Sequence, residues 1–123
     1  MAHIMAVALG GSAGALCRYG VALACIHWFG AHAAFGTLAV NVAGCLIIGV
    51  FGGASLSPGA LAHSGLVVGF LGALTTFSSF GLDTARLATG AGVAAAILNV
   101  AANLFFGLAA VAVGLWLGRG YLS

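Results

Sequence analysis

The chain has 123 residues, of which 63% are hydrophobic and 3% are charged, and its mean hydropathy is +1.27. Soluble domains carry about 25% charged residues, so one acidic and three basic side chains exclude a water-soluble fold. The formal net charge of +2, without a basic cluster, also excludes a nucleic-acid-binding function. We therefore interpret the chain as an integral membrane protein in contact with lipid.

Four apolar segments are long enough to cross a bilayer, which takes about 20 helical residues. They cover approximately residues 4–28, 35–51, 61–88 and 93–117, and short connections join them at 29–34, 52–60 and 89–92. No hydrophilic segment is long enough to form a separate domain. The prediction is an all-α, multi-pass membrane protein in which residues 1–123 form a single four-helix transmembrane domain.

The first span carries Arg18 in a segment rich in small residues. Gly10 and Gly14 lie about one helical turn apart and give this helix a smooth face for close packing. An arginine within a span is costly and usually faces protein, a cavity or the membrane surface. Two interpretations of Arg18 stay open: an anchor that reaches the membrane surface, or a cation that attracts anions into an aqueous vestibule.

The second span carries a hydroxyl and an amide at helical spacing. Thr37 and Asn41 are four residues apart, so their side chains share one face of the helix. Taken alone, such a pair is typical of hydrogen bonds that join two membrane helices. The other interpretation is a polar stripe along a pathway through the membrane.

The third span contains four hydroxyl residues within five positions, namely Thr75, Thr76, Ser78 and Ser79. Nearby glycine weakens a helix, and hydroxyl groups at membrane depth require partners. We therefore expect a break near residues 72–76, an arrangement that often forms ion or substrate sites. Unwound backbone would free carbonyl oxygens, which suit a hard cation such as Na⁺. In a symmetric dimer, two carbonyls from each copy would supply four oxygen ligands on the axis.

Two phenylalanines, Phe77 and Phe80, flank Ser78 and Ser79 just after the expected break. The edge of an aromatic ring is electropositive, so edge-on phenylalanines could coordinate an anion without a formal charge. Hydroxyl and amide groups would donate hydrogen bonds to the same ion and replace its lost water. The alternative is that both rings face lipid or pack in the core.

Asp83 and Arg86 are three residues apart near the end of the third span, which predicts a local ion pair at the membrane surface. Asp83 is the only acidic residue in the chain and thus the only carboxylate for general-base chemistry. No set of nucleophile, base and orienting group is visible beside it. The sequence therefore does not indicate an enzyme.

The fourth span repeats the polar spacing of the second span. Asn99 and Asn103 are four residues apart and share one helix face. Two polar stripes in one small bundle favour a lined pathway over two separate helix-joining hydrogen bonds. Asn103 joins Asn41 and Thr37 as a candidate residue of that pathway.

The three arginines give little preference for one orientation in the membrane. With four spans, Arg119 falls on one side, Arg86 on the other, and Arg18 within the first helix nearer the side of Arg86. Positive-inside bias is then nearly balanced, which favours insertion in both orientations and an antiparallel dimer. Four thin helices also provide too little protein to enclose a solvated path in one copy.

Together these motifs resemble the Fluc (CrcB) family of bacterial fluoride channels over nearly the whole chain. The motifs are the glycine-rich first span ending in Arg18-Tyr19, Gly36-Thr37-Leu38-x-Val40-Asn41-x-x-Gly44, and Gly69-Phe70-x-Gly72-x-x-Thr75-Thr76-Phe77-Ser78-Ser79-Phe80. The resemblance implies a dual-topology antiparallel homodimer with two pores in the bacterial inner membrane. It also implies passive, uncoupled fluoride efflux that protects the cell from fluoride.

The resemblance further implies roles for individual residues. Phe77 and Phe80 would form an aromatic box along each pore, and Arg18 would lie near a vestibule. The backbone carbonyls of Gly72 and Thr75 would hold a structural Na⁺ at the dimer axis. The polar path of the fluoride ion would include Asn41, Ser78, Ser79, Thr37 and Asn103.

Four positions depart from the usual pattern of this family. Ser79 stands where threonine is usual and Asp83 where glutamate is usual. Asn103 stands where serine is common, and Asn99 lies near a position that carries an aromatic hydroxyl in some members.

Two other functions stay open. One is a small dual-topology coupled transporter, a class that depends on a carboxylate in the first span, which this chain lacks. The other is a non-conducting accessory subunit.

Overall fold

The computed structural model describes residues 1–29, 33–54 and 59–121, and within these ranges every regular element is a helix. The elements are α1 (Ala2–Phe29), α2 (Ala33–Gly53), α3 (Ala60–His63), the π-helical η1 (Ser64–Leu71), α4 (Gly72–Leu74), α5 (Phe77–Gly90) and α6 (Val93–Tyr121). The third span comprises α3, η1, α4 and α5. The first two predicted connections lie partly outside the described residues.

Four helical segments are long and apolar enough to cross a membrane: Ala2–Trp28, Ala33–Gly53, Ala60–Gly90 and Val93–Gly120. This confirms the predicted all-α membrane fold, although the helices extend a few residues beyond the predicted bounds. The observed spans are longer because helical geometry continues into flanking residues that are less apolar. Length and hydropathy alone are therefore enough to find the spans.

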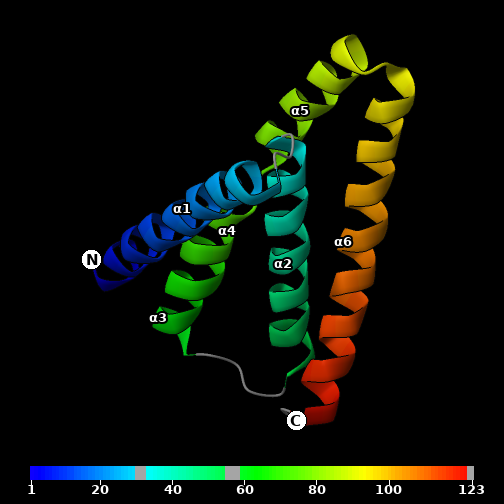
Figure 1. Cartoon of the computed structure of the whole chain (residues 1–123). Helices are drawn as coiled ribbons and strands as arrows, with labels where there is room; N and C mark the ends of the chain where they lie inside the picture. Colours follow the sequence, from blue (N-terminus) through cyan, green and yellow to red (C-terminus); the bar gives the residue numbers. More distant parts are fainter. Residues whose placement is uncertain (30–32, 55–58, 122–123) are drawn as a thin grey trace.

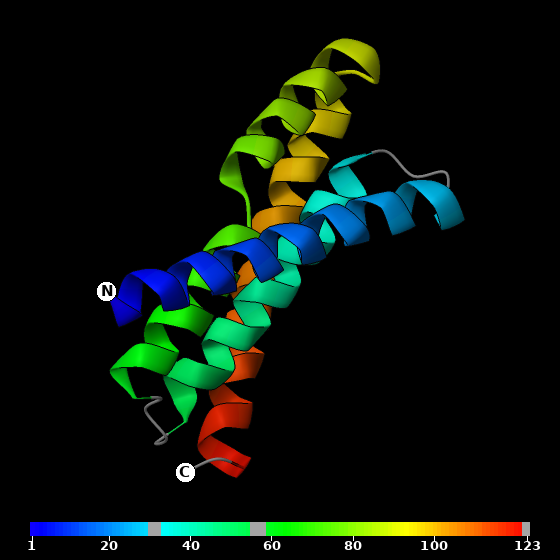
Figure 2. The same ribbon diagram turned by 90° about the vertical axis from the view of Figure 1, so that its left-hand side faces the viewer.

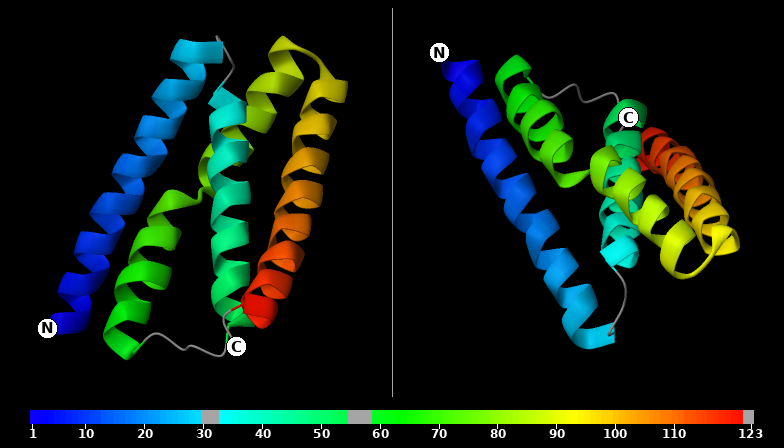
Figure 3. Two further views of the ribbon diagram at one scale, coloured as in Figure 1. Left: turned by 60° about the horizontal axis from the view of Figure 1, so that its bottom comes forward. Right: turned by 90° about the horizontal axis from the view of Figure 1, so that it is seen from above.

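The helices form an open layer with two halves (Figures 1 and 3). α2 and α6 pack along most of their length, while α1 packs against η1 and α4. α5 diverges from the rest of the third span and packs against α6 and α2, as the view in Figure 2 also shows. Because the described parts of α1 and α6 make no mutual contact, the single copy is not a closed bundle. Many large apolar side chains consequently remain exposed to lipid or to a partner.

Glycine allows the closest helix contacts in both halves. A Cβ added at Gly69 of η1 would lie 2.7 Å from the carbonyl oxygen of Val7, and one at Gly114 of α6 would lie 2.8 Å from the backbone nitrogen of Val50. A Cβ at Gly10 would overlap the carbonyl of Gly65. Small residues at such contacts let backbones approach and gain packing energy that lipid cannot replace. The predicted packing face on the first span is thus confirmed.

The third span departs from regular α-helix over a longer stretch than expected. Residues Ser64–Leu71 are π-helical, a geometry that usually occurs as single turns. Gly65 and Gly69 lie within this stretch against α1, and glycine tolerates backbone geometries that side chains resist. The sequence pattern indicates only the later break, because a change of helix type leaves the apolar composition unaltered.

The break itself lies at Thr75 and Thr76, inside the predicted range 72–76. Thr75 has φ −80° and ψ 154°, and Thr76 has φ −151° and ψ 117°, so both are extended. Gly72, which the sequence places within the break, remains helical, with φ −62° and ψ −31°. A small core of Val40, Leu71 and Leu74 lies beside the break and fixes the end of the preceding helix.

Gly10→Val should weaken the contact between α1 and η1, because its Cβ would overlap the backbone of Gly65. Overpacking of this kind costs about 1–3 kcal/mol, so we expect a lower denaturation midpoint in detergent micelles. Gly20→Val is the matched control on the same helix, since a Cβ at Gly20 meets nothing within 4 Å. Equal destabilisation by both substitutions would contradict the role of glycine packing.

Candidate functional site

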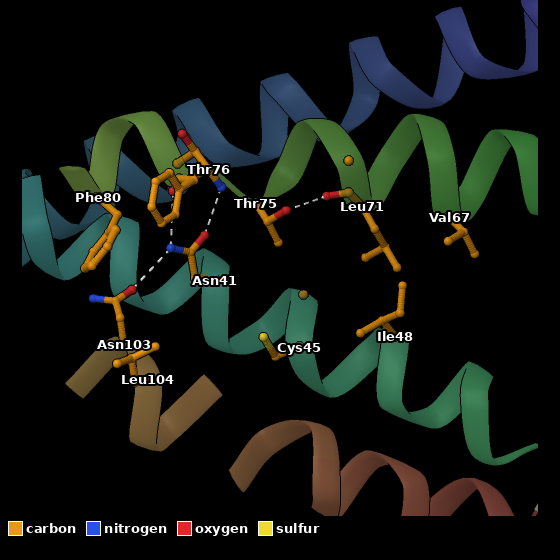
Figure 4. Close-up of a pocket in the computed structure, with 13 residues that line it drawn as sticks. Asn41, Cys45, Ile48, Val67, Leu71, Thr75, Thr76, Phe80, Asn103 and Leu104 are labelled. Atoms are coloured by element: carbon orange, nitrogen blue, oxygen red, sulfur yellow. Dashed lines mark hydrogen bonds between the residues drawn. The ribbon is translucent and has the colours of Figure 1, made fainter. Parts of the chain in front are cut away.

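A groove of about 460 Å³ runs beside the break and brings together side chains from three spans (Figure 4). Asn41 comes from α2, Asn103 from α6, and Phe77 and Phe80 from the start of α5. Most of the wall between these groups is apolar. Six predicted site residues therefore meet at one place, namely Asn41, Asn103, Phe77, Phe80, Gly72 and Thr75.

The amide of Asn41 replaces the helical partner that the backbone N–H of Thr76 loses at the break, and it also binds the carbonyl of Thr76. Its Oδ1 accepts from the backbone nitrogen of Thr76 at 2.8 Å, and its Nδ2 donates to the carbonyl of Thr76 at 3.3 Å. Backbone groups at membrane depth must be satisfied within the protein. Asn41 thereby stabilises the extended conformation of Thr76, which is buried.

The two threonines at the break have different tasks: Thr75 ends the helix before the break, and Thr76 caps the helix after it. Thr75 donates both its backbone N–H and its Oγ1 to the carbonyl of Leu71, at 3.1 and 3.0 Å, and so ends the preceding helix. Thr76 caps α5, because its Oγ1 accepts from the backbone nitrogen of Ser79 at 3.2 Å. Such N-caps satisfy one of the free donors in the first helical turn.

Ser78 and Ser79 gather around the hydroxyl of Thr76 and do not line the groove. The Oγ1 of Thr76 donates to Ser79 Oγ at 3.1 Å and lies 3.3 Å from Ser78 Oγ. Because α5 begins here, the positive end of its dipole lies in the middle of the third span. Half-helix N-termini of this kind favour negative charge.

A line of amides extends from the break across the groove to α6. Asn41 Nδ2 donates to Asn103 Oδ1 at 3.2 Å, and Asn103 Nδ2 donates to the carbonyl of Asn99 at 3.0 Å. The polar stripes predicted on the second and fourth spans therefore face each other and meet. Their direct contact agrees with the helix-joining interpretation, and Asn41 and Asn103 also line the groove, so the pathway interpretation stays a prediction.

The two phenylalanines form a tilted pair at the mouth of the groove. Their ring centroids are 5.5 Å apart and the ring planes make an angle of 52°. Phe77 is 82% exposed, whereas Phe80 is half-buried. A ring that is this exposed within a membrane span lacks part of its packing in a single copy. The aromatic wall of the groove is therefore open on one side.

A second cavity of about 370 Å³ lies between α1, α2 and α5 and contains Arg18. Thr37, Ser79, Asp83 and Arg86 also line it. Arg18 is half-buried, and both interpretations of this residue stay predictions. Thr76 lines both this cavity and the groove, so the break separates the two.

The predicted ion pair between Asp83 and Arg86 is wrong for the part of the chain that the structure describes. The carboxylate of Asp83 is buried and its Oδ2 accepts from Thr37 Oγ1 at 2.8 Å. Both Asp83 and Arg86 face the second cavity, but no hydrogen bond or ion pair joins them among the described residues. Packing of α5 against α2 thus overrides the spacing along the helix.

The backbone before the break provides oxygen atoms that could hold a cation. In a regular helix the carbonyl of Gly72 would accept from the backbone nitrogen of Thr76, but that N–H is donated to Asn41. Thr75 is itself extended, so its carbonyl also leaves the helical pattern. Uncommitted carbonyls are ligands that Na⁺ accepts, so the expected donor set fits this backbone.

Two residues of the network are not singled out as site residues by sequence reasoning. Thr76 is one of four hydroxyl residues in its segment, and only its contacts show that it holds the break. Thr84 carries no motif of its own, although it lies one turn beyond Phe80 and donates to the Phe80 carbonyl at 2.7 Å. Its spacing from Phe80 is the signal that could have indicated it.

Comparison with known proteins places the chain beside a single family. Residues 5–115 match the family described as CrcB-like protein, Camphor Resistance (CrcB). A fluoride-specific ion channel FluC from Pseudomonas fluorescens strain Pf-5 is 46% identical over 94% of this chain and 96% of the relative. A protein of the same description from Pseudomonas putida strain F1 is 45% identical over 97% and 98%. Another from Hydrogenovibrio crunogenus is 36% identical over 98% and 94%.

Asn41→Leu should destabilise the fold, because it leaves the N–H of buried Thr76 without its partner and removes the bond to Asn103. An unsatisfied buried group costs about 1–3 kcal/mol, so we expect a loss of at least about 2 kcal/mol in mixed-micelle denaturation. Ser12→Ala is the control, since the Ser12 hydroxyl donates only to a carbonyl of its own helix. An unchanged midpoint for Asn41→Leu would show that Asn41 does not support the break.

Proposed function

The chain belongs to the CrcB-like protein family, and we propose that it is a fluoride-selective ion channel of the bacterial inner membrane. The observation that carries this proposal is the near full-length identity of 36–46% to relatives named fluoride-specific ion channels. The four apolar spans fit a multi-pass membrane protein. Transport is passive and uncoupled, and it relieves the cell of fluoride.

The groove supports an anion path in its chemistry. A small, strongly hydrated anion loses water on entry and needs donors in exchange. The edges of Phe77 and Phe80 would supply electropositive contacts, and Asn41 and Asn103 would supply amide N–H groups by releasing hydrogen bonds that they make within the network. The N-terminal end of α5 adds partial positive charge at the same depth. On the other side of Thr76, Arg18 attracts anions into the second cavity, which we assign as the vestibule.

The open side of the groove supports a dimer in which a second copy completes the pore. Phe77 is 82% exposed, and the groove walls come from one layer of helices. A second copy packed there would cover the exposed ring and exclude lipid from the amides. The even distribution of arginines supports insertion in both orientations. We therefore assign the functional unit as an antiparallel homodimer with two pores.

The same dimer would hold a structural Na⁺ through backbone carbonyls of Gly72 and Thr75. The bond from Thr76 N–H to Asn41 supports this assignment because it leaves the Gly72 carbonyl without that helical partner. Two carbonyls from each copy would provide the oxygen ligands that a hard cation prefers. When bound, the ion would supply positive charge near the break and join the two copies.

Purified protein in liposomes loaded with potassium fluoride should release fluoride rapidly when valinomycin is added, as recorded with a fluoride electrode. Valinomycin allows K⁺ to leave, so an uncoupled fluoride path becomes visible as net efflux. Liposomes loaded with potassium chloride should release little chloride. If folded protein released neither anion, the proposal would fail in favour of a coupled transporter or an accessory subunit.

Phe80→Ile should slow fluoride efflux by at least about tenfold, which corresponds to about 1.4 kcal/mol of lost stabilisation along the path. The substitution removes the electropositive ring edge but keeps an apolar side chain of similar depth. Phe105→Ile is the matched control, because Phe105 also belongs to an aromatic pair but is 69% exposed and lies away from the groove. Normal efflux through a folded Phe80→Ile protein would exclude Phe80 from the pore.

A further inference from the structure

The position of α5 depends on polar contacts more than on apolar packing. Asp83 is its one buried residue, and Phe77 in its first turn is 82% exposed. Thr76 binds Asn41 just before α5, Asp83 binds Thr37, and Thr84 binds Asn99. The first two contacts join the third span to α2. The third contact joins α5 to α6, one turn beyond Phe80.

The contact between Asn99 and Thr84 has a defined direction. The single hydroxyl proton of Thr84 goes to the carbonyl of Phe80 at 2.7 Å, because a carbonyl can only accept. Asn99 Nδ2 therefore donates to Thr84 Oγ1 at 2.9 Å. With its nitrogen committed to Thr84, the side-chain oxygen of Asn99 is left to accept from Asn103 Nδ2, at 3.4 Å.

The opposite end of the network requires the same order of donors and acceptors. The backbone N–H of Thr76 needs the oxygen of Asn41, so Asn41 Nδ2 faces the oxygen of Asn103. Asn103 Nδ2 must then face Asn99, whose backbone carbonyl accepts at 3.0 Å. The hydrogen bonds run from Thr76 through three amides and Thr84 to Phe80. All of them agree with one orientation of the side chains of Asn41, Asn103 and Asn99.

Asn99 lies outside the groove, whereas its partner Asn103 lines it. Asn103 and Phe80 line the groove, and Asn99 instead borders an apolar pocket between α2, α5 and α6. Asn99 connects the amides of the groove to its phenylalanines, because it bonds to Asn103 on one side and, through Thr84, to the carbonyl of Phe80 on the other. It acts on the groove only through Asn103 and through Thr84.

We propose that Asn99 is a positioning residue that sets the place of Phe80 relative to the amides of the groove, acting through the Thr84 hydroxyl. The consequence for conduction rests on the proposed channel function, whereas the positioning itself does not. Hydrogen bonds between membrane helices are individually weak. Here the bond lies between a thinly packed helix and its neighbour, so its loss lets Phe80 move while the fold persists.

The test combines a probe on the Phe80 ring with flux through the same proteins. Full-length protein carrying 4-fluorophenylalanine at position 80 is studied by ¹⁹F NMR in micelles, and efflux per folded protein is measured without the label. Asn99→Leu and Thr84→Val each remove the contact. Thr84→Ser keeps the hydroxyl, and Thr89→Val removes a hydroxyl that bonds only to α5 carbonyls.

Asn99→Leu and Thr84→Val should each shift or broaden the ¹⁹F resonance and lower fluoride efflux about fivefold. The double variant should match either single variant, because residues that act as one unit are not additive. Thr84→Ser and Thr89→Val should resemble the unsubstituted protein in both measurements. If Asn99→Leu fails to fold, the comparison of Thr84→Val with Thr84→Ser still tests the proposal.

The proposal is overturned if Asn99→Leu and Thr84→Val leave the resonance unchanged, or if their effects add in the double variant. It is also overturned if Thr89→Val produces the same change. Absence of fluoride efflux from the unsubstituted protein would instead refute the channel function. The resonance of Phe80 would still decide whether Asn99 positions the ring.

Discussion

The structure depends on the way Asn41 satisfies a broken backbone inside an apolar layer. A helix that opens at mid-span exposes an N–H and a C=O, and lipid offers no partner for either. One carboxamide has both a donor and an acceptor, so Asn41 binds both groups of Thr76. Without this residue, the N–H of Thr76 would lack a partner at membrane depth, and the extended conformation there would be less favourable.

The bond from the Thr76 N–H to Asn41, in place of the Gly72 carbonyl, has several consequences for the site. It frees the Gly72 carbonyl from the Thr76 N–H and starts a new helix whose N-terminus lies at membrane depth. It also commits the remaining amide hydrogen of Asn41 toward Asn103 on α6. Asn41 and Asn103, which help to hold the third span in place, therefore also line the groove. Support and candidate path are built from one network.

Close packing at glycine and side-chain hydrogen bonds hold different parts of this protein together. Glycine contacts hold α1 against η1 and α2 against α6, where backbones approach closely. α5 has little such packing and is instead tied by hydrogen bonds at Thr76, Asp83 and Thr84. The groove lies where the third span meets α2 and α6. The exposed apolar faces that remain suit lipid and a second copy.

The sequence by itself determined the membrane class, the four spans, the approximate break and six of the thirteen residues that line the groove. Hydropathy and helical spacing are local properties, so residue spacing alone assigns Asn41 and Asn103 to polar stripes. Only tertiary structure decided that Gly72 stays helical, that Asp83 binds Thr37 instead of Arg86, and that Thr84 links Asn99 to Phe80. These outcomes depend on partners from other helices, and in an apolar medium the available partner outweighs local backbone preference.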